Sequence, residues 1–383
     1  MNIRKVFFWF HLIIGCSAAL FIFLMSLTGA ALTYERQMIK AAVKADYPTA
    51  PTSNSQALSL DQLINIAHQF PAQKTPSIAL TNDKGAIVEV KDGRKTIAYL
   101  NPYTGETMAP PGAGTKRFLK KLRAFHRWLT LDGSFSESGR WVNGISNVIF
   151  SILILSGIYL WLPKRFTSRA FKHKLVLTIQ HSSIKARDYQ WHNVFGFYIA
   201  PVLFLLVITA FFFSFKWPGQ TLKNYASTHS VIELPSPKVL DSPTSGSLLS
   251  QQQLLNQLQA SYPQWQSIRF SLPKQATDIQ IFTVDNGNGG EPHKNTTVAV
   301  SRLSGETVAE QSFEQRSEYR KIRSYIRFLH TGEVFGLTGQ TIAGVVSLVA
   351  CLLVYTGAML SIRRWRNANA RKAQTAIPQA EIT

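Results

Sequence analysis

Cysteine is nearly absent from this sequence: the 383 residues include two, Cys16 and Cys351, and both lie within long apolar stretches. A thiol in such a stretch serves as a small buried hydrophobic side chain, so we expect no disulfide. The sequence also contains no C-x-x-C-H run, so any haem would be held by coordination and packing, without thioether bonds. Zinc and iron-sulfur sites built from cysteine are excluded as well.

Several common catalytic motifs are also missing. The sequence contains no Walker motif, dinucleotide fingerprint, H-E-x-x-H motif or nucleophile elbow. Flavin, nicotinamide and hydrolase functions therefore have no support within this chain, and a reducing cofactor of those kinds must belong to another protein. The run DNGNGG at 285–290 is similar to a calcium loop, but glycine stands where the third position needs an oxygen ligand, so we expect a turn.

Acidic residues are few: Asp and Glu number 21 against 41 Lys and Arg, which gives a formal net charge of +20. A basic chain attracts phosphate, but here the basic residues gather at the ends of the apolar stretches. They are Arg4, Lys5, Lys164, Arg165, Arg169, Lys172, Lys174, Lys185, Arg187, Arg363, Arg364 and Arg366. This placement is typical of membrane topology signals, so we expect membrane lipid as a partner and no nucleic acid.

Four apolar stretches are long enough to cross a hydrocarbon core of about 30 Å, which takes roughly 20 helical residues. They are residues 6–32, 141–162, 191–215 and 338–361. The first begins like a signal peptide, but its apolar part is too long, so we interpret it as an uncleaved anchor. The positive-inside rule places both termini and the basic loop between the second and third stretches in the cytoplasm.

The second half of the chain repeats the first in short, ordered matches. The matched segments are Trp9-Phe10-His11 and Trp191-His192, Gly15 and Gly196, 104–107 and 304–307, 122–126 and 326–330, and Ser156-Gly157 and Thr356-Gly357. Each half therefore consists of a helix, an external domain, a basic segment carrying one histidine, and a second helix. Duplication is the simplest explanation.

The two long polar segments each predict a small α+β domain outside the membrane. Each begins with a helical pattern, at 60–70 or 248–262, and strand-like alternation follows. In the first domain, the strand patterns at 86–90 and 96–100 flank Asp92-Gly93 and predict a hairpin. We therefore expect an α-helical integral membrane protein with four transmembrane helices and two external α+β domains.

The predicted boundaries follow from these patterns. They are a first transmembrane helix at 1–35, an external domain at 36–116, an interfacial helix and second transmembrane helix at 117–162, a basic cytoplasmic loop at 163–190, a third transmembrane helix at 191–215, a second external domain at 216–315, an interfacial helix and fourth transmembrane helix at 316–362, and a cytoplasmic tail at 363–383.

Four histidines lie at the membrane surfaces as two pairs. His11 and His192 lie near the cytoplasmic ends of their helices, and His126 and His330 lie at the external surface. Two neutral imidazoles from facing helices leave a six-coordinate haem iron suited to electron transfer. We therefore predict two bis-histidine haem b groups, in which the glycine one turn beyond each inner histidine leaves room for a porphyrin edge. A copper or zinc site, or a merely interfacial role for each ring, is the alternative.

Arginines surround the outer histidines. They are Arg123, Arg127, Arg323 and Arg327. A guanidinium binds carboxylates through two parallel hydrogen bonds, so these side chains are candidates for binding haem propionates or an anionic substrate. Contact with lipid headgroups explains them equally well. No cofactor role is assigned to the remaining histidines, His68, His173, His181, His229 and His293.

Three segments carry a resemblance to a known family. They are Phe125-His126-Arg127, Trp191-His192-Asn193 with Gly196, and Leu329-His330-Thr331-Gly332, and the two Gly-Glu-Thr turns at 105–107 and 305–307 accompany them. In these the chain resembles the PepSY-associated transmembrane helix family, and within it the siderophore-iron reductases, over nearly its whole length. The resemblance implies a bacterial inner-membrane protein with PepSY-like periplasmic modules. It would bind haem b and pass electrons outward to a ferric siderophore.

Such a reductase needs an unidentified cytoplasmic electron donor at the inner histidine pair and a docking place for the iron complex between the external domains. It needs no catalytic residue beyond haem ligands, because the cofactor carries the chemistry. The alternative is a non-enzymatic membrane protein whose PepSY-like domains bind or restrain a periplasmic partner, which predicts no haem. A transporter is disfavoured, since no predicted span carries a buried acid or a break in its middle.

Overall fold

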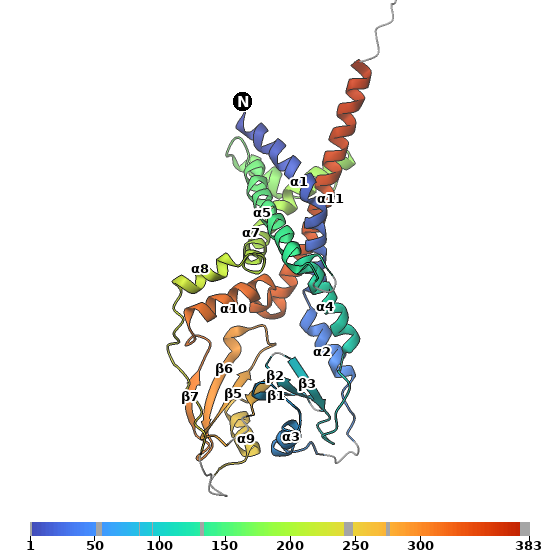
Figure 1. Ribbon diagram of the computed structural model, residues 1–383. Helices are drawn as coiled ribbons and strands as arrows, with labels where there is room; N and C mark the ends of the chain where they lie inside the picture. The colour runs from blue at the N-terminus through green and yellow to red at the C-terminus, as the bar shows by residue number, and fades with distance from the viewer. Residues whose placement is uncertain are drawn as a thin grey trace, which may run out of the picture.

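The computed structural model describes residues 2–50, 56–83, 85–93, 95–130, 134–240, 248–272 and 276–375, with the side chains of residue 173 and of 371–375 left aside. The chain forms two parts (Figure 1). One part is a bundle of long helices, and the N-terminus and the far end of the last described helix lie at the same end of it. The other part is built on a β-sheet and lies beyond the opposite end of the bundle.

Four long helices form the bundle: α1 (Ile3–Leu32), α5 (Ser136–Trp161), α7 (Ile184–Ser214) and α11 (Gly336–Thr375). All four are long and apolar enough to cross a membrane, which confirms the predicted spans. Helices α5 and α11 each pack against both α1 and α7. Small and branched side chains such as Ile154, Leu203 and Ala350 fill the buried centre.

Shorter helices lie where the bundle ends. They are α2 (Glu35–Ala45), α4 (Ala113–Trp128), α6 (Ser168–Leu175), α8 (Trp217–Tyr225), α10 (Glu318–His330) and the 3-10 turn η2 (Glu333–Phe335). Helices α4 and α10 precede α5 and α11, at the places where the sequence predicts interfacial helices. A close approach of backbones builds both corners: a Cβ added at Gly139 would lie 1.7 Å from the Trp128 carbonyl, and one at Gly339 would lie 2.2 Å from the Gly332 carbonyl.

Seven strands form one antiparallel sheet in the order β3-β2-β1-β4-β5-β6-β7. They are β1 (Pro76–Thr81), β2 (Val88–Asp92), β3 (Lys95–Leu100), β4 (Ser267–Ser271), β5 (Ile279–Asp285), β6 (Asn295–Ser301) and β7 (Thr307–Gln311). The predicted hairpin is confirmed as β2–β3, and its turn uses Gly93 at φ 61°. The run DNGNGG forms the β5–β6 turn, preceding the 3-10 turn η1 (Pro292–Lys294).

The sequence predicts two separate α+β domains, and this prediction is wrong. The two α+β segments share this one sheet. Strand β1 of the first pairs with β4 of the second, from Ser77 opposite Ser271 to Thr81 opposite Ser267. Helices α3 (Leu60–Ala67) and α9 (Gln251–Ser261) pack on the apolar face of the common sheet. Their first turns also cap each other.

This mutual capping is a reciprocal set of hydrogen bonds between the two segments. The Asp61 carboxylate of α3 accepts hydrogen bonds from the backbone N–H groups of Gln251 at 2.9 Å and Gln252 at 3.1 Å. In return, the Gln252 side-chain oxygen accepts the Leu60 N–H at 2.7 Å. Helix N-termini leave such N–H groups without partners, so each helix completes the other.

Candidate functional site

The inner histidine pair lies between two transmembrane helices. His11 of α1 and His192 of α7 have ring centres 6.5 Å apart and ring planes at 89°. Two imidazoles that bind one metal ion, each through a nitrogen about 2 Å from it, have ring centres about 6 Å apart. The structure therefore brings the predicted inner pair to a separation that suits one shared metal ion.

Both inner rings are held through Nδ1 by a hydroxyl on a neighbouring helix. His11 Nδ1 lies 2.8 Å from Ser156 Oγ on α5. His192 Nδ1 lies 3.0 Å from Thr356 Oγ1 on α11 and 3.1 Å from the Leu353 carbonyl. Ser156 and Thr356 occupy matching positions of the repeat found in the sequence. In the structure, each hydroxyl forms a hydrogen bond with Nδ1 of an inner histidine.

The outer pair is built in the same way on the interfacial helices. His126 Nδ1 of α4 lies 2.8 Å from Thr28 Oγ1 on α1. His330 Nδ1 of α10 lies 3.2 Å from Thr209 Oγ1 on α7 and 2.9 Å from the Leu206 carbonyl. Burial, and then the neighbouring charge of His330, lower the pKa of His126 to about 4, so this ring is neutral at pH 7.

The hydroxyl partners decide which ring nitrogen carries the proton. Each hydroxyl donates its one proton to a carbonyl in the preceding turn of its own helix. Its oxygen must then accept from the histidine Nδ1–H. For His192 and His330 the additional carbonyl contact requires the same assignment, because a carbonyl only accepts. All four Nε2 atoms therefore keep a free lone pair, as a metal-binding imidazole needs.

A small residue follows each hydroxyl and lets the ring lie against the helix. A Cβ added at Gly157, Gly357 or Gly29 would lie 3.4, 3.1 or 3.4 Å from the Cε1 atom of the ring that it faces. Ala210 stands at the fourth position. The predicted glycines have a different neighbourhood: a Cβ on Gly15 would lie 3.5 Å from a Leu153 methyl group. Gly15 therefore serves helix packing.

The four predicted arginines differ in their surroundings, and Arg327 stacks over Phe328, 5.2 Å from the ring centre. Arg123 forms an ion pair with Glu35 at 3.0 Å. Arg127 stacks over Trp128, 5.0 Å from the ring centre, and has no carboxylate partner within the described part of the chain. Arg323 instead donates to the Tyr319 hydroxyl at 2.9 Å.

Arg140, at the start of α5, is an additional cation that sequence reasoning missed. Partial burial, and then the charges of Arg140, Arg123 and Arg327, lower the pKa of the Arg127 guanidinium, so these side chains lie close together. Among the residues that the structure describes, the buried Nε of Arg140 has no hydrogen-bond partner. A buried donor without a partner is costly, and a carboxylate ligand beside Arg127 would relieve that cost.

A family model for the PepSY-associated TM region matches residues 8–364. The chain belongs to this family. The match includes all four paired histidines and their hydroxyl partners. No curated protein matches the sequence.

The inner end of this PepSY-associated protein contains a buried acid just ahead of the predicted third span. Asp188 lies one turn before His192 in α7 and is fully buried. Its carboxylate accepts hydrogen bonds from Arg363 of α11 at 2.5 Å and from Arg187 at 2.9 Å. Helix α7 begins several residues before the apolar stretch, which is why hydropathy did not include Asp188. Its ion pair with Arg363 holds α7 against α11 at the level of the inner pair.

Sequence reasoning found the four histidines but not the role of their partners. The sequence showed Ser156 and Thr356 as matching positions of the repeat but did not indicate that they contact the histidines. Thr28 and Thr209 follow His11 and His192 at the same spacing along their helices, and that shared spacing is the signal that would have identified them.

Proposed function

We propose that this membrane protein is a haem b-dependent oxidoreductase that passes electrons across the bacterial inner membrane and reduces a ferric siderophore in the periplasm. The observation that supports the proposal is the repeated histidine arrangement. Four imidazoles are hydrogen-bonded through Nδ1, the rings of His11 and His192 have centres 6.5 Å apart, and His330 lies close enough to His126 to add to the lowering of its pKa by burial. An interfacial histidine with no ligand role needs none of these features.

The residues present fit two haem groups. His11 and His192 would hold the inner group, and His126 and His330 the outer one. Arg127, which has no carboxylate partner among the described residues, and Arg140, whose buried Nε has none there either, would bind propionates of the outer group. When bound, haem with two imidazole ligands supplies reversible one-electron transfer.

The protein fixes the separation of the two pairs through shared helices. Helix α1 carries His11 of the inner pair and Thr28 of the outer pair, and α7 carries His192 and Thr209. At 1.5 Å per residue, each helix rises about 25 Å between these positions. This is close to the hydrocarbon thickness of about 30 Å. The apolar bundle core lies between them and excludes water.

Reduction at the outer pair needs neither a general acid nor a nucleophile from the protein. Hard oxygen donors of a siderophore hold iron(III) tightly, and one-electron reduction weakens that hold and releases iron. The protein's task is to place the iron complex close to the outer pair. The shared sheet, which lies beyond that end of the bundle (Figure 1), supplies the surface for docking.

A direct test uses purified protein that has been reduced without oxygen. Adding a ferric siderophore should reoxidise the haem bands, and a ferrous chelator should trap the released iron. The same siderophore loaded with gallium(III), which cannot be reduced in this way, is the matched control and should leave the bands reduced. Bands that stay reduced with the ferric complex contradict the proposal. A protein without haem, even after haem supplementation, favours the non-enzymatic partner-binding alternative.

A further inference from the structure

Each outer histidine has an arginine one turn ahead of it. Arg123 precedes His126 in α4, and Arg327 precedes His330 in α10, each by three residues. Residues at this spacing lie on the same face of a helix. The two arginines are therefore carried by the same helix faces as the two outer rings.

Glu35 pairs with the first of these arginines and interacts electrostatically with the second. It is in the first turn of α2, its side chain is 21% exposed, and its carboxylate pairs with Arg123 at 3.0 Å. Burial raises the pKa of the Glu35 carboxyl, the charges of Arg123, Arg36 and Arg327 oppose this shift, and Glu333 adds to it. One carboxylate therefore faces charged groups on α4 and α10, the two helices that carry the outer pair.

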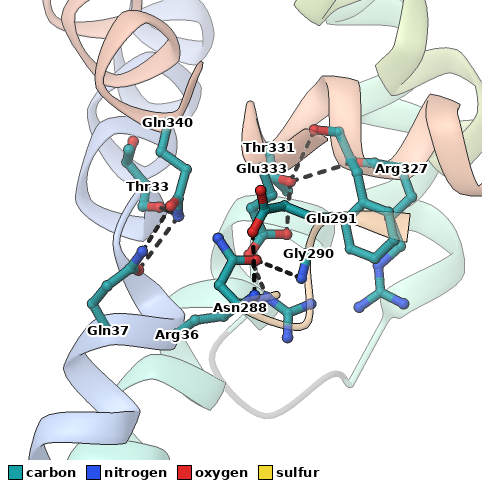
Figure 2. Close-up of polar contacts among 11 residues, drawn as sticks. Thr33, Arg36, Gln37, Asn288, Gly290, Glu291, Arg327, Thr331, Glu333 and Gln340 are labelled. Atoms are coloured by element: carbon teal, nitrogen blue, oxygen red, sulfur yellow. Dashed lines mark hydrogen bonds and ion pairs between the residues drawn. The ribbon is translucent and has the colours of Figure 1, made fainter. Parts of the chain in front are cut away.

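A second acid, Glu333, also lies near Arg327 and opposes the lowering of the pKa of that guanidinium more than Glu35 does. Glu333 of η2 forms an ion pair with Arg36 and accepts a hydrogen bond from the Thr331 hydroxyl at 2.9 Å. Figure 2 shows this group, with Arg327 beside it. Nearby, Gln340 of α11 donates to the Thr33 carbonyl at 2.8 Å, which fixes the α1–α2 junction that carries Glu35.

The arrangement is specific to the first half of the chain. Glu35 follows Thr28 in the first half. In the second half, Lys216 follows the equivalent threonine, Thr209, at the same spacing. A cation there cannot balance a guanidinium. The halves thus share their histidines and hydroxyl partners, but in the first half a carboxylate pairs with the arginine ahead of the outer histidine.

We propose that Glu35 is a positioning residue for the outer histidine pair. Its carboxylate ties α4 through Arg123 and, together with Glu333, balances Arg327 on α10, so that His126 and His330 keep the spacing at which one iron binds both. This inference rests on the proposed haem function. It extends that function by naming the group outside the ligand set that holds the two interfacial helices together.

The test compares Glu35→Gln with Glu89→Gln. Glu89 is a suitable control because its side chain is 28% exposed and pairs with Lys91 at 2.7 Å, but it lies in the sheet. The low-spin EPR spectrum of the oxidised protein reports the relative orientation of the two ring planes at each iron. His126→Ala and His11→Ala variants assign the two signals. We expect Glu35→Gln to shift the outer signal and weaken retention of the outer haem about tenfold, with the inner signal unchanged.

Two further measurements separate positioning from general damage. Glu35→Asp keeps the negative charge beside both arginines and should retain the outer signal that Glu35→Gln shifts. Spin labels at Lys121 on α4 and Arg323 on α10, in a background without the two native cysteines, measure the helix separation in haem-free protein. We expect a broader distance distribution in Glu35→Gln than in Glu89→Gln.

Several results would overturn this inference. These are an outer signal that Glu35→Gln leaves unchanged, equal shifts of both signals, an equal effect of Glu89→Gln, or a Glu35→Asp variant whose outer signal is shifted as far as that of Glu35→Gln. A wild-type protein that binds no haem contradicts the proposed function instead. In that case the spin-label distances still decide whether Glu35 holds the two helices together.

Discussion

The two histidine pairs are alike in their hydrogen bonds and different in their supports. His11 and His192 both project from transmembrane helices and are held by two others, α5 and α11. His126 and His330 project from interfacial helices that dock on α1 and α7. The inner pair is therefore fixed by the bundle itself, while the outer pair depends on how two short helices are held at its end.

This difference suggests a division of tasks. A rigid inner pair suits reception of electrons at constant geometry, whereas the outer pair lies beside the sheet, the arginines and Glu35. Changes in the external unit can therefore reach the outer pair through α4 and α10 more directly than they can reach the inner one. The predictions below test the separation of the two pairs, beginning with the largest expected effect.

Removal of one outer ligand should empty one site only. His126→Ala is expected to lower the haem content by half, because the inner pair is built from other helices, and His11→Ala should leave the outer haem in place. Pyridine haemochrome analysis together with EPR measures content and identity. Loss of both haem groups, or of neither, from either variant contradicts independent pairs.

Loss of the buried acid should weaken the inner end. Asp188→Asn removes the charge that Arg363 and Arg187 share, and breaking a buried ion pair costs about 3 kcal/mol of unfolding free energy. Denaturant unfolding in detergent measures the cost. Asp83→Asn, which removes exposed pairs with lysines, is the control and should cost less than about 1 kcal/mol. If the outer haem signal changes as much as the inner one, the two ends are coupled and the comparison fails.

Within the inner pair, the two hydroxyls should differ in importance. Ser156→Ala removes the hydrogen-bond partner of His11 Nδ1, while Thr356→Val leaves His192 the Leu353 carbonyl. We expect Ser156→Ala to weaken inner haem binding by about tenfold or more, and Thr356→Val by less. Competition with a haem-binding apoprotein measures both affinities. The reverse order would show that the carbonyl contact does not support the ring.

The smallest effect is expected at the glycines that face the rings. Gly357→Ala would place a methyl group 3.1 Å from His192 Cε1, closer than a comfortable contact, whereas Gly157→Ala leaves 3.4 Å to His11. We expect a small shift of the inner EPR signal in the first variant and a smaller one in the second. Equal spectra for Gly357→Ala and the wild type would mean that the His192 ring can move away from the added methyl group without changing its orientation.

Much of the fold follows from the sequence because its signals are local. Length and apolarity define the four spans, and Asp92-Gly93 defines the β2–β3 hairpin. The common sheet could not be predicted from the sequence. Strands β1 and β4 are far apart in the chain, and no sequence feature of either strand indicates that it pairs with the other. The reciprocal caps at Asp61 and Gln252 are equally invisible before the two helices meet.

At the site, repetition identified the ligands but not their supports. Four histidines in equivalent places were enough to predict two pairs. Helix packing brings Thr28 to His126 across 98 positions of the chain and Thr209 to His330 across 121, and hydropathy does not encode packing. Glu35 and Arg140 were missed because each lies beyond the basic segments that drew attention to the other arginines.

The central claim is that each histidine pair binds one haem, and the most direct measurement is the haem content of the purified wild-type protein. A reduced-minus-oxidised visible spectrum with pyridine haemochrome quantification should give sharp b-type bands and a ratio near two haem groups per chain. A colourless protein after haem supplementation, or a preparation that holds copper or zinc in place of haem, would contradict the account.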